Sequence, residues 1–136
     1  MIDLSQVRVG LTGSAEVVVA EEHTAPFVGS GRVRVLATPV MINLMEAAAL
    51  DAAESLLPAG HQSLGIRLDV RHYAATPVGM RVRVTAELVQ IEGRTLTFRV
   101  EAREDKEPIG DGVHERVVVN VARFDERVRK KVTQRS

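Results

Sequence analysis

Residues 39–50 constrain the fold more than any other segment, because this apolar run carries a single charged side chain, Glu46. Thr38, followed by proline, is typical of a helix start, since threonine caps free N–H groups and an early proline loses no hydrogen bond. We predict a helix from Thr38 to about Leu57, stopped by the proline and glycine of residues 58–60. A helix with so little polar surface must be covered by other elements.

The remaining elements are predicted to be strands. Residues 81–89 and 96–102 alternate polar and apolar side chains on either side of the turn 92–94, which predicts a hairpin with one wet face. Residues 21–34 are rich in glycine and contain a proline, so they are predicted to form a loop. The other segments with the composition of strands are 14–20, 64–73 and 112–124.

One strand, one long apolar helix and four further strands indicate an α+β fold, with residues 1–136 as a single domain. A curved antiparallel sheet wrapped around one central helix is the hotdog arrangement, and this is the predicted fold. Open sheet edges are a liability, and the helix is only half covered by one sheet. We therefore expect a homodimer, with a tetramer as the alternative.

Composition excludes several classes of function. The 136 residues include 18 basic and 18 acidic side chains, so no basic surface is expected for nucleic acid. The absence of cysteine excludes disulfides, thiolate catalysis and cysteine-ligated zinc. Neither a signal peptide nor an apolar stretch of membrane-spanning length is evident, so a cytoplasmic protein without a membrane partner is expected.

Three residues form the candidate catalytic group: Thr38, Glu46 and His72. A hydroxyl, a carboxylate and an imidazole are sufficient for acyl-transfer chemistry. Each also has a structural interpretation. Thr38 is expected to cap the helix; Glu46 either reaches solvent or pairs with an arginine; His72, sharing a strand face with Val70, is either packed or catalytic. Asn43, the one polar side chain at helical spacing from Glu46, is a candidate substrate-binding residue.

Two further groups leave alternatives open. His114 and Arg116 share one face of a predicted strand, where a cross-strand ion pair or hydrogen bond is favoured over a functional role. The basic stretch 123–135 is predicted to be a solvated tail, with binding of nucleotide phosphates as the weaker alternative.

Four separated motifs together resemble the fluoroacetyl-CoA thioesterase-like branch of the hotdog thioesterases. They are residues 37–46, 63–65, 70–77 and 112–116, and the similarity extends from about Leu36 to Lys131. The resemblance implies that Thr38, Glu46 and His72 are the catalytic trio. It also implies that the backbone N–H of Gly65 contacts the thioester carbonyl.

The implied activity is hydrolysis of a small or medium acyl-CoA, in which coenzyme A is part of the substrate and neither a cofactor nor a metal is needed. Residues 31–35 depart from the fluoroacetyl-specific pattern, because they lack the phenylalanine that closes the site there. A general acyl-CoA thioesterase is therefore the expected function. The alternatives are a non-catalytic acyl-CoA-binding protein and an enoyl-CoA hydratase or dehydratase.

Overall fold

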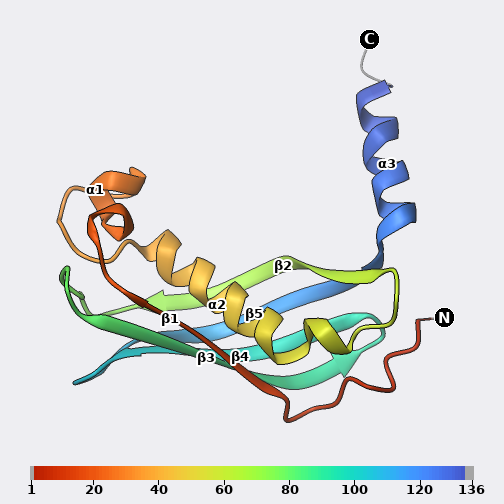
Figure 1. Ribbon diagram of the computed structural model, residues 1–136, viewed down its shortest axis with the longest axis horizontal. Coiled ribbons are helices and arrows are strands. Elements are labelled where there is room, and N and C mark those ends of the chain that lie inside the picture. Colours follow the sequence, from red (N-terminus) through yellow and green to blue (C-terminus); the bar gives the residue numbers. More distant parts are fainter. Residues whose placement is uncertain (1, 134–136) are drawn as a thin grey trace.

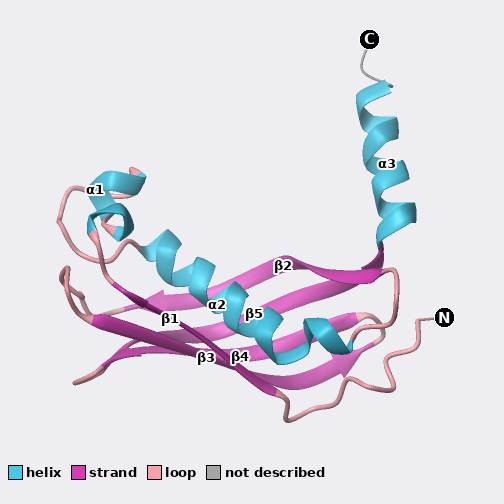
Figure 2. Cartoon of the chain, in the orientation of Figure 1, coloured by secondary structure: helices cyan, strands magenta, loops and turns pink. Residues whose placement is uncertain are grey.

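A five-stranded antiparallel sheet curls around one long helix in the computed structural model, which describes residues 2–133 (Figures 1 and 2). The order of strands in the sheet is β1-β3-β4-β5-β2, so β1 and β2 are its edges. The predicted hotdog fold is confirmed. The strands are β1 (Thr12–Val18), β2 (His61–His72), β3 (Arg81–Glu92), β4 (Thr95–Glu104) and β5 (Pro108–Asn120).

The central helix, α2 (Thr38–Ala53), lies on the concave face of the sheet (Figure 1). Its buried face is made of small and flexible apolar side chains, and a 3-10 turn, η2 (Glu54–Leu56), follows it. Strand β1 crosses very close to the helix, because a Cβ at Gly13 would collide with the helix backbone at Ala48. The core includes Met41, Met45, Ala48, Ala49, Val84, Leu88 and Phe98.

The predicted hairpin is confirmed by the pairing of β3 with β4, closed by a tight turn in which Gly93 has a φ of 60°. Burial alternates along β3: Val82 and Val84 are buried, whereas Arg81 and Arg83 are exposed. One face of the hairpin therefore faces α2 and the other faces water, as the period of two requires.

The predicted N-cap role of Thr38 is wrong. Ala37 occupies the cap position, no side chain caps the helix, and Thr38 is the first helical residue.

The predicted loop 21–34 is also more ordered than expected, since it contains the turn η1 (Glu21–His23) and the one-turn helix α1 (Ala25–Val28). Helix α1 starts with a proline in its first turn and ends at Gly29, whose φ of 83° stops it.

The C-terminal region matches its prediction only in part: residues 123–133 are largely exposed, as expected for a solvated segment, but they are helical and the predicted strand ends earlier. Strand β5 ends at Asn120, and residues assigned to a strand and a solvated tail form helix α3 (Val121–Thr133). The Asn120 side chain accepts a hydrogen bond of 3.1 Å from the backbone N–H of Arg123, as a helix cap does. Helix α3 projects away from the sheet beyond β2 (Figure 1).

No helix among residues 2–133 has the length and apolar character to cross a membrane.

Candidate active site

Thr38 and His72 meet where the start of α2 approaches the end of β2. The Thr38 Oγ1 and His72 Nδ1 atoms are 2.8 Å apart, a hydrogen-bond distance. This contact explains why Thr38 does not cap its helix, because the hydroxyl is directed to the imidazole. The pair lines a pocket of about 290 Å³ whose other wall includes Gly31, Arg32 and Val33.

His72 is suited to proton transfer at neutral pH. Partial burial lowers its pKa below the ordinary value of a histidine, so the ring is neutral near pH 7. Its Nε2 atom is buried and has no hydrogen-bond partner among residues 2–133. An unpartnered buried nitrogen next to a pocket is expected to meet a substrate or a water molecule.

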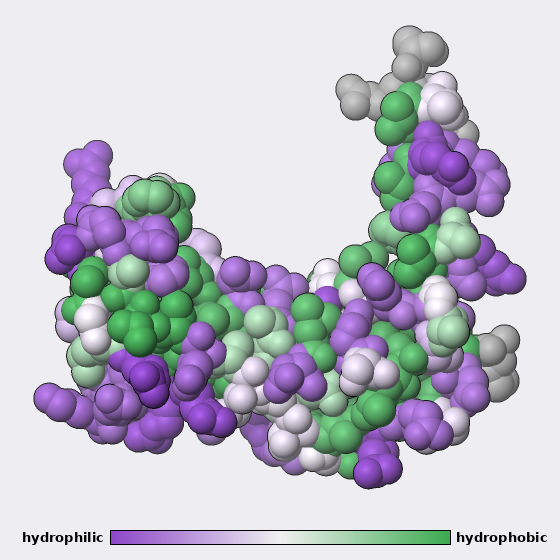
Figure 3. Space-filling view, viewed as in Figure 1, coloured by the Kyte–Doolittle hydropathy of each residue, from purple (hydrophilic) through white to green (hydrophobic). Residues whose placement is uncertain are grey.

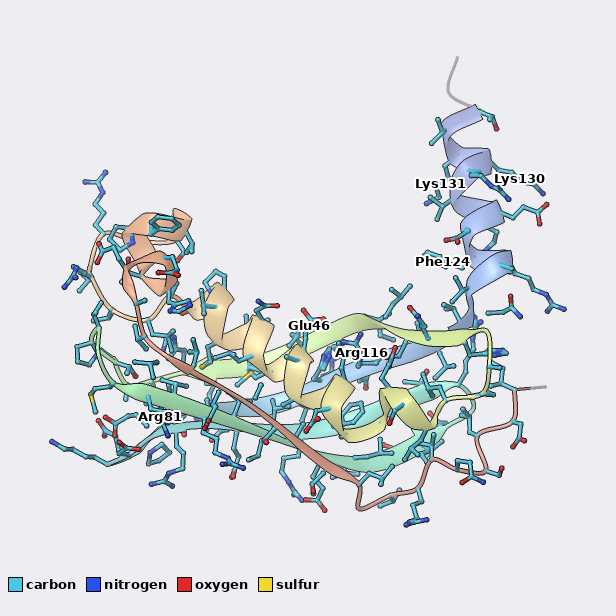
Figure 4. The ribbon with its side chains drawn as sticks, viewed as in Figure 1. Glu46, Arg81, Arg116, Phe124, Lys130 and Lys131 are labelled. Atoms are coloured by element: carbon cyan, nitrogen blue, oxygen red, sulfur yellow. The ribbon has the colours of Figure 1, made fainter. Side chains whose placement is uncertain are left out.

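Glu46 lies at a second position, in the middle of α2, where it faces β2 and β5. Its side chain lies beside that of Arg116 (Figure 4). The Glu46 Oε2 atom is 3.2 Å from Arg116 Nη1 and 4.0 Å from His114 Nε2. A Cβ at Gly65 would collide with the same oxygen, so only glycine leaves room for the carboxylate there. The Arg116 side chain is 7% exposed and that of Glu46 is 37% exposed, so the carboxylate is held from one side and open on the other.

Arg116 is fixed by a chain of hydrogen bonds that reaches back to the end of α2. Its Nε donates to Ser63 Oγ at 2.7 Å and its Nη2 donates to the Ser63 carbonyl at 3.0 Å. The Ser63 hydroxyl in turn donates to Glu54 Oε1 at 2.5 Å. A buried guanidinium needs such compensation, because its desolvation is otherwise expensive. The network therefore sets the position of the group that holds Glu46.

His114 completes this network as a neutral ring. Its Nδ1–H donates to the carbonyl oxygen of Arg67 at 2.9 Å, and its Nε2 accepts from Arg116 at 3.1 Å. A carbonyl can only accept, so this pattern fixes the tautomer. Burial lowers the pKa of His114, which agrees with a side chain that is fully buried.

One chain does not bring the three predicted catalytic side chains together. Thr38 and Glu46 are eight residues apart on α2, or about 12 Å along a helix axis. The structure instead forms two groups: Thr38 with His72, and Glu46 with Gly65 and Arg116. Asn43, predicted to bind substrate, is exposed on α2, and its role stays a prediction.

The family model described as fluoroacetyl-CoA-specific thioesterase matches residues 19–122, which include every residue of both groups. The chain belongs to this family. A curated fluoroacetyl-CoA thioesterase from Streptantibioticus cattleyicolor is 46% identical over 97 residues, which cover 71% of this chain and 70% of that protein. The family indicated by the sequence motifs is thus confirmed.

Solved structures of related proteins agree with the fold. The structure of the fluoroacetyl-CoA thioesterase FlK matches with a TM-score of 0.85 and 39% identity, over 92% of this chain and 97% of that chain. A thioesterase superfamily member from Thermus thermophilus matches with a TM-score of 0.87 and 32% identity, over 93% of this chain and 94% of that one.

The expected alternative that Glu46 pairs with an arginine is confirmed, but the sequence did not indicate that this arginine is Arg116. Arg116 and His114 were recognised as neighbours on one strand face, but their contact with Glu46 crosses 70 residues of sequence for the arginine. Ser63 could be suspected only because it lies two residues before Gly65 in the same motif, and no sequence pattern indicates Glu54. Among residues 2–133, no cluster of three histidine, aspartate or glutamate side chains is arranged to hold a metal ion.

Proposed function

We propose that this chain is an acyl-CoA thioesterase for a small or medium acyl group. The observation that carries the proposal is the Glu46 carboxylate, which a buried guanidinium fixes beside Gly65 while its outer side stays open. A carboxylate so held can act as a nucleophile or as the base for water. The geometry leaves both routes open, and family membership supports the reaction.

The proposed roles follow from the two groups. The backbone N–H of Gly65 holds the thioester oxygen, and Glu46 attacks the carbonyl or activates the attacking water. Thr38 orients His72 through the 2.8 Å contact. Because the ring is neutral, His72 takes a proton from water and passes it to the departing thiolate. Hydrolysis breaks the C–S bond and forms the carboxylic acid and the free thiol of coenzyme A.

A second copy of the chain is the simplest way to unite the groups. Strand β2 is a long edge strand with apolar side chains exposed along it, including Ile66 at 54%. Above it lies a hollow between the α1 end of the molecule and α3 (Figure 3). Phe124, Val128 and Val132 recur every four residues on α3, and Val132 is 69% exposed, so this helix also lacks a partner for its apolar side.

We infer a homodimer in which two β2 strands pair antiparallel. The register of β2 against β5 shows an irregularity between Gly65 and Arg67, where a bulge sets two residues opposite one. Pairing of the two copies centred on Asp69 places this bulge opposite His72 of the other copy. Glu46 of one copy then serves the Thr38–His72 pair of the second, and each dimer holds two such sites.

Release of free thiol from a panel of acyl-CoAs tests the activity. Turnover of one or more members is the expected result. Binding without thiol release would instead identify a non-catalytic acyl-CoA-binding protein, and hydration of an enoyl-CoA would identify a hydratase.

The shared site is tested by mixing inactive subunits. Glu46→Gln and His72→Ala homodimers are each expected to lose most activity, typically about 10²- to 10⁴-fold for a proton-transfer group. Co-expressed, they should regain about a quarter of the wild-type rate, since half of randomly formed dimers are mixed and each holds one intact site. No recovery in purified mixed dimers would place the whole site within one chain.

The acyl preference is expected to differ from that of a fluoroacetyl-specific enzyme. The wall of the Thr38–His72 pocket contains Gly31, Arg32 and Val33, with no aromatic side chain from residues 31–35. Its aromatic lining residue is Tyr73, which follows β2. A small apolar contact discriminates by only about 1–3 kcal/mol. The ratio of kcat/KM for fluoroacetyl-CoA to that for acetyl-CoA is therefore expected to stay below about a thousandfold.

A further inference from the structure

A second, larger pocket lies at the end of β2 opposite the Thr38–His72 pair. It has a volume of about 780 Å³ and is lined by three arginines from two elements: Arg94 from the turn between β3 and β4, and Arg123 and Arg127 from the first two turns of α3. Ile2, Leu4 and Ile91 supply an apolar part of its wall. This size and mixture of surfaces is typical of a site for a small organic ligand.

The pocket is positively charged without internal compensation. No aspartate or glutamate lines it, and none of the three arginines forms an ion pair within residues 2–133. Arg34 and Arg99 pair with carboxylates, but the exposed Arg81, Arg83 and Arg103 form no ion pair within residues 2–133 either. The distinguishing feature is that three such arginines line one pocket. Three uncompensated guanidinium groups around one pocket favour an anion with several negative charges, above all one carrying phosphates.

Helix α3 reinforces this preference and orients the arginines. The helix begins at Val121, next to the pocket, and its dipole favours negative charge there. The N–H groups of Val121 and Arg123 themselves donate to Gly60 and Asn120. The Arg127 guanidinium lies 5.8 Å from the centre of the Phe124 ring, which restricts its position. Lys130 and Lys131 are farther along α3 and do not line the pocket (Figure 4).

The distance from the pocket to Glu46 fits one particular ligand. His61, which lines the pocket, is four residues before Gly65 on β2, or about 13 Å along a strand. An extended pantetheine arm, with bonds of the lengths found in a polypeptide, reaches on the order of 20 Å. A thioester at Gly65 and Glu46 is therefore within reach of nucleotide phosphates in the pocket.

We propose that Arg94, Arg123 and Arg127 bind the phosphates of the nucleotide part of an acyl-CoA, while its thioester lies at Glu46 of the same chain. This inference rests on the proposed function. It identifies three specificity-determining residues, which select substrates that carry the nucleotide and take no part in the chemistry of the thioester.

The kinetic test compares two substrates with the same acyl group, an acyl-CoA and the acyl-pantetheine that lacks the nucleotide. In an Arg123→Ala/Arg127→Ala variant, KM for the acyl-CoA should rise by about tenfold or more, as expected for loss of charge-assisted hydrogen bonds. Its kcat, and both constants for the acyl-pantetheine, should stay within about twofold of wild type. Arg94→Ala should act in the same direction.

Two controls separate this effect from a general loss of positive charge. Arg81→Ala removes an exposed arginine at the far end of the sheet, and Lys131→Ala removes a charge from α3 outside the pocket (Figure 4). Both variants should keep the wild-type KM and kcat for acyl-CoA and for acyl-pantetheine. An equal rise of KM in the controls, or an equal loss with acyl-pantetheine, would overturn the assignment.

Direct binding tests the pocket independently of turnover. Adenosine 3′,5′-bisphosphate should bind the wild-type protein in calorimetry, and the double variant should bind it about tenfold or more weakly. Equally tight binding of inorganic phosphate would show a general anion site and contradict the nucleotide assignment. Absence of thiol release from any acyl-CoA refutes the proposed function, whereas unaltered binding by the variant refutes this site.

Discussion

The two groups of candidate catalytic residues are held in opposite ways. Glu46 is fixed by Arg116, whose three nitrogens are all engaged by His114, Ser63 or Glu46 itself. Thr38 and His72 depend on one hydrogen bond between a side chain exposed on the helix and a half-buried ring. A buried network therefore holds the first group, and a single side-chain hydrogen bond joins the members of the second.

This difference matches the tasks proposed for each group. A nucleophile or base gains from a fixed position, since displacement by about 1 Å can lower a rate by 10²-fold. A proton donor to a departing thiolate must instead follow the leaving group. We therefore expect changes around Glu46 to affect stability and rate together, and changes around Thr38 to affect mainly the rate.

The largest effect is expected from Arg116→Met, which breaks the network at its centre. Loss of the guanidinium leaves the buried Ser63 and His114 without this hydrogen-bond partner, which typically costs about 1–3 kcal/mol, whereas the partly exposed Glu46 adds little. Urea unfolding should show a loss in this range, and Arg81→Met, at an exposed position, should change stability by less than about 0.5 kcal/mol. Similar losses for both variants would mean that the network contributes little.

Gly65→Ala tests the contact between β2 and the carboxylate. The added Cβ would collide with Glu46 Oε2 and come within 3.2 Å of His114 Cε1, so the flexible glutamate must move. The expected loss of kcat is about 10²-fold, with destabilisation of about 1 kcal/mol from overpacking. Thiol release and urea unfolding measure the two. A fully active variant would show that the position of Glu46 is not critical.

The sequence predicted the architecture well because that architecture depends on local patterns. Alternation in β3 and β4 and the apolar run in α2 are visible without the fold, and they determine which faces meet. Helix α3 was missed because Val117 to Ala122 continues the apolar pattern of β5, so the boundary at Asn120 depends on its cap rather than on periodicity. Because the cap is the single residue Asn120, the composition of the segment does not reveal it.

The candidate site was only partly predictable for a related reason. Thr38, Glu46 and His72 were found from residue type and spacing, but their division into two groups depends on where the helix crosses the sheet. The support of Glu46 links residues from α2, η2, β2 and β5, and no sequence spacing reveals that Glu54 holds Ser63.

Thr38 gives a smaller effect that separates the two groups again. Because Thr38 does not cap α2, Thr38→Val removes one hydrogen bond to His72 while keeping the shape of the side chain. The free energy of unfolding of Thr38→Val should fall by no more than about 1.5 kcal/mol. Its kcat should fall further than this loss of stability explains. Thr38→Ser should retain activity. Thermal unfolding and thiol release should be measured on both variants. A Thr38→Val variant with the wild-type rate would contradict a role in catalysis.

The smallest expected effect is the pH dependence of stability from the two buried histidines. Burial lowers the pKa of both His72 and His114, so the unfolded chain binds more protons than the folded one just below the ordinary histidine value of about 6.5. Their contribution to stability is therefore complete above that pH and is lost as the pH falls through it toward the folded pKa values.

Urea unfolding of wild type at pH 7.5, 6.5 and 5.5 should accordingly show decreasing stability. His114→Asn should flatten part of this slope even though it lowers stability at every pH, because the loss of a buried hydrogen-bonding ring and the loss of a titrating group are separate effects. His72→Asn should flatten another part while leaving the Arg116 network intact. A slope unchanged in the double variant would mean that other groups, chiefly carboxylates titrating at lower pH, account for the acid sensitivity.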